Sequence, residues 1–428
     1  MTTAAATGTR QTRAAATRQR IVVAARELFV ANGYRATSLR DIAAAASVSH
    51  PGLLGHFASK DEVLAEVVAG FEEDNEKALD EITSDAEPGE LVSATIAARN
   101  ARTEGYLELF AALTGEASSP EHPAHERMRE RYGRLRDSTR ELLDDARQHG
   151  TMDAERDAAG ETVRHMAGWD GLQLISQYLP DRVDVVSVLE EREALWALPL
   201  GWRDPDAAPP THTPSSAPLP EPLQATPPQA LEPSSGYAVG RRRRAQILAD
   251  AMRLFAQDGY GDTSLQDIAA AVGVSKSTLL HHYSSKELLL SAVLAERDRS
   301  ITSRADLPPA DTAAEALRSI AGGARVNAQR EPGLIEVYAV LSCEAVPAAH
   351  PAHDYFAVRF ALVIDHFAEL FRRAQDDGAL AAHRDPEHEA VWLVAMWDGL
   401  QYQWLYDRDA VDVAAQLRAH LDDVLPPR

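Results

Sequence analysis

The chain has 428 residues, of which 25% are charged and only 6% aromatic, and its formal net charge at pH 7 is −22. This length favours two to four domains, and no uninterrupted apolar stretch of about 18 residues is present that would cross a membrane. Because the first residues lack the apolar core of a signal peptide and Cys343 has no second cysteine to pair with, we expect a cytoplasmic protein.

The composition predicts an all-α fold. Ala, Leu, Arg, Glu and Asp dominate, whereas strand-forming runs of Val, Ile and Thr are scarce. The negative net charge disfavours binding to phosphate, but arginines gather at two places, residues 10–20 and 241–244, and acidic residues lie downstream of each. This distribution indicates two basic heads on acidic bodies.

Residues 1–16 are predicted to form a disordered basic tail. After them, apolar residues recur at helical spacing up to Phe29, and Gly33 ends this first helix. Thr37 and Ser38 are of the types that cap a helix N-terminus, and they open a second, alanine-rich helix.

A tight turn then leads to a third helix, HPGLLGHF, which Ser49 caps. Two short helices joined in this way form the helix-turn-helix arrangement, whose second helix enters the major groove of DNA. Residues 33–60 therefore predict a DNA-binding head.

The same pattern occurs twice. Residues 33–60, GYRATSLRDIAAAASVSHPGLLGHFASK, return as GYGDTSLQDIAAAVGVSKSTLLHHYSSK at residues 259–286. HPAH begins at His122 and at His350, and WDGLQ at Trp169 and at Trp397. Because this period exceeds 200 residues, it is too long for a solenoid repeat and indicates two whole copies of one unit.

The sequence resembles the TetR family of bacterial transcription regulators. The string aromatic-x-x-x-G-Y-x-x-T-S-L-x-D-I-A, then V-S, then L-L-x-H-F/Y-x-S-K, runs from Phe29 to Lys60 and from Phe255 to Lys286. The resemblance implies a three-helix DNA-binding head in each unit. It also implies a helical body that binds a small-molecule effector and pairs through a four-helix bundle, in which WDGLQ would belong to the late dimerisation helices.

The expected organisation has six parts. They are a tail at 1–16, a first DNA-binding head at 17–64, a first effector and dimerisation body at 65–203, a Pro-rich linker at 204–239, a second head at 240–291 and a second body at 292–425. Residues 199–233 hold eleven of the 24 prolines, and as a coil such a segment would span about 35 Å. This reach would allow the two units to pack side by side.

The residues expected to contact DNA lie in both heads. In the first head they are Arg18, Thr37, Ser38, Arg40, His50, Pro51, Gly52, His56 and Lys60. In the second head they are Arg244, Thr263, Ser264, Gln266, Lys276, Ser277, Thr278, His281, His282 and Lys286. Because the outward-facing residues differ between the heads, we expect an operator with two unlike half-sites. A rival interpretation is that the first head has decayed and serves mainly as a partner in dimerisation.

The bodies give weaker signals. HPAH places two imidazoles three residues apart, a spacing that can serve a metal on a helix, but the intervening proline favours a loop or a helix start and no ligand cluster completes a site. WDGLQ is best explained as core or interface. Since no nucleophile elbow, zinc-protease motif, phosphate-binding glycine loop or cysteine constellation occurs, we predict neither an enzyme nor a bound metal or cofactor.

The sequence thus predicts a ligand-responsive transcriptional regulator, most simply a repressor, whose partners are double-stranded DNA and a small molecule of unknown identity. One chain would form an internal pseudo-dimer, while a homodimer of two chains with four heads remains an alternative. The alternative functions are an architectural DNA-binding protein that responds to no ligand and, less favoured, an enzyme with an active site in a helical bundle.

Overall fold

The computed structural model describes residues 2–34, 37–120, 122–205, 218–220, 238–302, 310–330 and 332–426. Over these residues the secondary structure is helical, as the composition predicted, and it contains no strand. The first unit comprises α1 Thr2–Asn32, α2 Leu39–Ala45, α3 His50–Leu54, α4 Lys60–Asp85, α5 Ser93–Arg102, α6 Tyr106–Glu116, α7 His125–His149, α8 Ala158–Tyr178 and α9 Val185–Trp196. The second comprises α10 Ala238–Asp262, α11 Leu265–Val272, α12 Lys276–His282, α13 Lys286–Thr302, α14 Ala313–Arg330, α15 Pro332–Glu344, α16 His353–Asp376, α17 Pro386–Tyr406 and α18 Val413–Val424.

The same capping interactions begin the short helices of both heads. Ser38 caps α2 and Ser264 caps α11, and in each case an aspartate three residues later completes a capping box. Ser49 and Ser275 cap α3 and α12, as predicted. The first helix of the first head is longer than expected: α1 begins at Thr2 and so includes residues 2–16 of the predicted disordered tail. Alanine, the strongest helix former, is frequent there.

The turn between the two short helices differs between the heads. Gly273 adopts the left-handed conformation with φ +72°, and Ser47 occupies the equivalent place in the first head with φ +55°. Serine pays a steric cost in this region that glycine avoids. The third helix of the first head also ends at Leu54, before the predicted Phe57, because Gly52 and Gly55 are poor helix formers.

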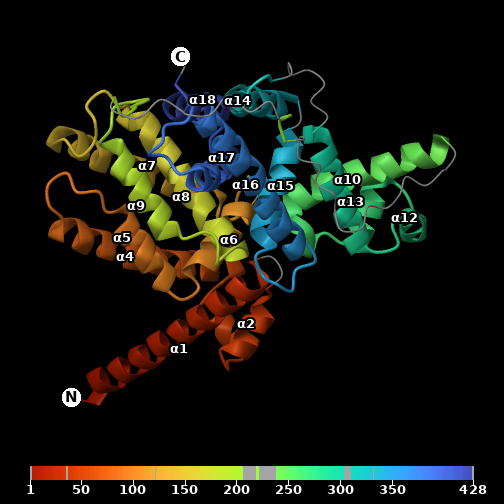
Figure 1. Ribbon diagram of the computed structural model, residues 1–428. Helices are drawn as coiled ribbons and strands as arrows, with labels where there is room; N and C mark the ends of the chain where they lie inside the picture. Colours follow the sequence, from red (N-terminus) through yellow and green to blue (C-terminus); the bar gives the residue numbers. More distant parts are fainter. Residues whose placement is uncertain are drawn as a thin grey trace.

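The two bodies lie side by side at the centre of the molecule (Figure 1), where α8 of the first unit packs along α17 of the second. With α7 and α16 these helices form a four-helix bundle within one chain. Gly171 and Gly399, the glycines of the two WDGLQ strings, lie at the crossing. A Cβ atom on either would come within 1.9 Å of a backbone oxygen of the opposite helix. WDGLQ is therefore an interface motif, and its glycine allows the two helices to approach closely.

Two expected boundaries fall inside helices rather than between them. The head and body boundaries predicted at residues 64 and 291 lie within α4 and α13, each of which runs from its head into its body. Most of the expected linker, residues 206–217 and 221–237, lies outside the described residues.

Candidate nucleic-acid interface

The second helix of each helix-turn-helix pair, α3 or α12, is called the recognition helix here. The two recognition helices present different side chains to the solvent. The exposed residues among the predicted contacts are Ser38, Arg40, Pro51 and Gly52 in the first head and Ser264, Gln266, Lys276, Ser277, Thr278 and His281 in the second. His50, His56 and His282 are partly buried. The second head therefore offers more exposed hydrogen-bonding side chains than the first.

Thr37 and Thr263 do not face outward, which corrects their predicted contact with DNA. Each is only 2% exposed. The Thr37 hydroxyl lies 2.8 Å from the Gly33 carbonyl oxygen, and the Thr263 hydroxyl lies 2.7 Å from that of Gly259. The two threonines hold the loop between the first two helices of each head, and the adjacent serines are the caps.

Four basic residues predicted to contact DNA are engaged within the heads. Arg18 lies over the Phe57 ring, donates to Glu66 and also donates to the His56 carbonyl oxygen at 2.7 Å. In the second head, Arg244 lies over the Tyr283 ring. These arginines fix the C-terminal end of the recognition helix against the preceding long helix.

Lys60 and Lys286 have a matching role at the opposite side of each head. Each ammonium lies 4.2 Å from the centre of a tyrosine ring, that of Tyr34 or Tyr260, and donates to a backbone oxygen of the same loop. The predicted contacts on α3 and α12 that are exposed are Pro51, Gly52, Lys276, Ser277, Thr278 and His281, and their contact with DNA stays a prediction.

The HPAH strings join each head to its body, a role that the sequence analysis missed. The first histidine, His122 or His350, meets the tyrosine ring of the head edge-on, with ring centres 5.0 and 5.1 Å apart. Burial lowers the pKa of His350 to about 4, so its ring is neutral near pH 7. Across the described residues no group of three potential metal ligands occurs.

Glu344 at the end of α15 completes the junction in the second unit. Its carboxylate accepts hydrogen bonds from the backbone N–H groups of Tyr260 at 2.6 Å and Gly261 at 2.5 Å. Gly259 has a positive φ of 73°, and a Cβ there would lie 2.9 Å from the same carboxylate. The Gly-Tyr pair of the second head thus needs its glycine for docking as well as for the kink that Gly259 makes in α10.

The second body encloses a cluster of charged groups, which we call the second-body charge cluster: Arg297, Asp298, Tyr338, Arg359 and Asp398. Arg359 and Arg297 pair with Asp298 at 2.8 and 3.2 Å. Burial raises the pKa of Asp398 to about 6, although both arginines act to lower it. Within the described part of the chain, Oδ2 of Asp398 and Nε of both arginines are buried without a hydrogen-bond partner.

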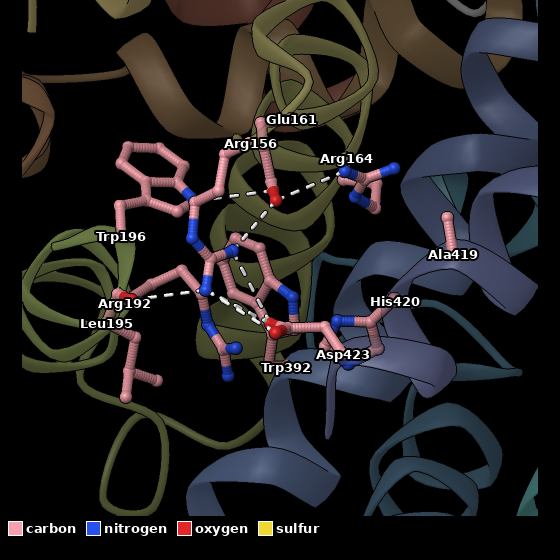
Figure 2. Close-up of a pocket in the computed structure, with 10 residues that line it drawn as sticks. All are labelled: Arg156, Glu161, Arg164, Arg192, Leu195, Trp196, Trp392, Ala419, His420 and Asp423. Atoms are coloured by element: carbon pink, nitrogen blue, oxygen red, sulfur yellow. Dashed lines mark hydrogen bonds and ion pairs between the residues drawn. The ribbon is translucent and has the colours of Figure 1, made fainter. Parts of the chain in front are cut away.

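A small polar pocket lies between the bodies, and its lining comes from both units (Figure 2). Arg156 of the first unit reaches Glu161 at 3.0 Å and Asp423 of the second unit at 3.4 Å. Asp423 also pairs with Arg384 at 3.1 Å, which in turn pairs with Glu389 at 2.8 Å. Since nearly every charge here has a partner, the pocket is best explained as a buried ion-pair network that joins the bodies.

Comparisons with known proteins agree with these two heads. The family described as "Bacterial regulatory proteins, tetR family" matches residues 21–67 and again 247–293. The family described as "BetI-type transcriptional repressor, C-terminal" matches residues 313–426. Among the described residues, no helix is long and apolar enough to span a bilayer.

Individual relatives are also transcriptional regulators. The uncharacterized HTH-type transcriptional regulator YezE of Bacillus subtilis is 30% identical over 142 residues, which cover 32% of this chain and 72% of YezE. The A-factor receptor protein of Streptomyces griseus is 24% identical over 42% of this chain and 61% of its own length. A solved regulator from Saccharomonospora viridis in complex with choline is 25% identical, covers 43% of this chain and 95% of its own, and has a TM-score of 0.38.

Proposed function

Because the chain belongs to the TetR family of DNA-binding transcriptional regulators, we propose that it works as a single-chain regulator that reads an asymmetric operator. A dimer of identical subunits presents two identical recognition helices and reads a palindrome. Here residues 50–52 of α3, a histidine, a proline and a glycine, stand where residues 276–278 of α12 are a lysine, a serine and a threonine. Two heads with such different surfaces suit two unlike half-sites.

The single-chain part of the proposal rests on how the first body packs against the second. The Trp392 side chain of α17 lies over Gly168 of α8, where a Cβ would be 2.4 Å from the ring. The position equivalent to Gly168 in the second unit is Met396, since HPAH and WDGLQ both recur 228 residues later. Two second bodies would therefore bring Trp392 against a methionine, so the two halves of one chain fit each other better than two second bodies would.

Effector binding is the second part of the proposal. Among the described residues, the Nε–H groups of Arg297 and Arg359 and the Oδ2 atom of Asp398 are buried in this cluster without a hydrogen-bond partner. Unpaired buried groups of this kind are costly, and a ligand that carries an acid group and a hydroxyl or amine would satisfy them. An effector bound there would change the spacing of the heads and release the DNA, with a coupling of about 1–3 kcal/mol.

The test is a selection of bound sequences from random DNA with the purified full-length chain. We expect two unlike half-sites at a fixed spacing. A palindrome would instead indicate that two chains pair through like heads, and a lone half-site would indicate that only one head reads DNA. A titration of the complex with small acids then distinguishes a regulator, which releases DNA, from an architectural protein, which does not.

A further inference from the structure

Each unit contains a three-way junction at the C-terminal end of α6 or α15. The HPAH segment follows this end, and its first histidine contacts the head of the same unit, as described above. Its second histidine begins the next helix, and its Nδ1 lies 2.8 Å from the Ala117 carbonyl oxygen for His125 and 3.0 Å from that of Ala345 for His353. The junction is therefore held to its own head on one side and to its own body on another.

The third side of each junction belongs to the opposite body. Tyr406, the last residue of α17, stacks on His125 with ring centres 5.5 Å apart, and its hydroxyl donates to the Thr114 carbonyl oxygen at 2.9 Å. Tyr178, the last residue of α8, stacks on His353 at 5.1 Å and donates to the Ser342 carbonyl oxygen at 2.5 Å. The arrangement is reciprocal, and each tyrosine is buried.

These contacts are continuous with the head cores. Tyr406 belongs to the same hydrophobic cluster as the core of the first head, including Phe29 and Tyr34, although it comes from the second unit. Tyr178 belongs to the cluster that contains the core of the second head, including Phe255 and Tyr260. Close-packed interiors resist gradual deformation. A small shift is therefore transmitted by the rigid movement of whole helices.

We propose that each head is positioned by the opposite body: Tyr406 of the second body sets the orientation of the first head, and Tyr178 of the first body sets that of the second. The route runs from the tyrosine to the end of α6 or α15, and then to the Gly-Tyr pair of the head. The links are the first HPAH histidine and either Glu116, whose carboxylate lies 3.8 Å from His122 Nε2, or Glu344. A shift along α8 and α17 therefore reaches both heads at once, which is what a change of head spacing on DNA requires. The physical origin is reciprocal packing, which ties each junction to both halves of the chain.

The inference rests on the proposed function only where it concerns DNA binding. The positioning of the heads can therefore be tested on the protein without DNA. The full-length chain and its Tyr178→Phe and Tyr406→Phe variants are compared by hydrogen exchange. Loss of one hydroxyl hydrogen bond at Tyr178 should raise exchange about fivefold in the part of α10 that follows its kink at Gly259, where Glu344 protects the Tyr260 and Gly261 amides, and leave the first head unchanged. Tyr406→Phe should raise exchange in α2 and leave the second head unchanged.

Each variant is the matched control of the other. Exchange that rises in the head of the mutated unit, in both heads equally or in neither would overturn the inference. Half-site protection on the selected operator is a second readout, in which Tyr178→Phe should weaken the site of the second head alone. If the chain selects no operator but the crossed exchange pattern appears, the proposed function fails and the positioning by the opposite body stands.

Discussion

The indole of Trp392 fills the space directly above the Cα of Gly168. Three ring atoms would lie within 2.7 Å of a Cβ at that glycine, so no other residue fits there without movement. The contact is not repeated by symmetry. Arg164 of the first unit is equivalent to Trp392, and Met396 of the second unit is equivalent to Gly168. A large side chain on one body and a glycine on the other make the two halves complementary.

Gly168→Met should therefore disrupt the pairing of the bodies. It introduces into α8 the residue found at the equivalent position of α17, and the overpacking should lower the free energy of unfolding by about 3 kcal/mol. Urea denaturation followed by tryptophan fluorescence measures the change. Gly70→Met is the control, since a Cβ at this exposed glycine of α4 meets no described residue within 4 Å. Equal effects of the two substitutions would show that the contact does not select the partner.

Local features of the fold could be predicted from sequence, and contacts between distant segments could not. Ser38 and Ser264 were recognisable as caps because the aspartate that completes each box is three residues away. The docking of Glu344 on the Tyr260 amide joins residues 84 apart, and nothing in either segment indicates the other. The same holds for Trp392 and Gly168, which come from different units. Such contacts depend on how helices cross, which periodicity leaves open.

Some residues predicted to contact DNA have partners within the protein for a related reason. Thr37 has the side chain of a phosphate ligand, and only the path of the loop shows that its hydroxyl turns inward to the Gly33 carbonyl. Arg18 likewise has the charge of a phosphate ligand, but its partners Phe57 and Glu66 are brought to it by folding. Residue type defines what a side chain is able to bind, and its neighbours decide whether it is available.

Ser47→Gly should stabilise the first head. Ser47 has φ +55°, in the left-handed region that disfavours a Cβ, and glycine removes a cost of about 1 kcal/mol. Slower hydrogen exchange of the α2 amides is the expected result. The reverse change, Gly273→Ser, should speed exchange in α11, because Gly273 has φ +72° in the same turn. Unchanged exchange in both variants would show that the turn tolerates serine without strain.

Asp398 should make the stability of the chain depend on pH. Burial raises its pKa from 3.8 to about 6. Between these two pH values the folded state therefore keeps a proton on Asp398 that the unfolded state has lost. The contribution of Asp398 to stability is therefore full below about pH 4 and is lost as the pH rises to about 6, by roughly 3 kcal/mol in total. The unfolding free energy of the wild type minus that of Asp398→Asn should fall as the pH rises across this range. A constant difference would contradict the raised pKa.

The two heads should contribute unequally to DNA binding. Lys276 and Thr278 are exposed on α12 and suited to phosphate or base edges, whereas α3 offers His50 beside a proline and a glycine. A contact to a base or phosphate contributes about 1–3 kcal/mol, so replacing both Lys276 and Thr278 by Ala should weaken binding to the selected operator about 10- to 100-fold. His50→Ala should weaken it far less. Fluorescence anisotropy at fixed salt measures both affinities, because the lysine contribution depends on ionic strength. Equal losses would show that the first head reads its half-site as strongly as the second, which would remove the interpretation of the first head as a decayed partner.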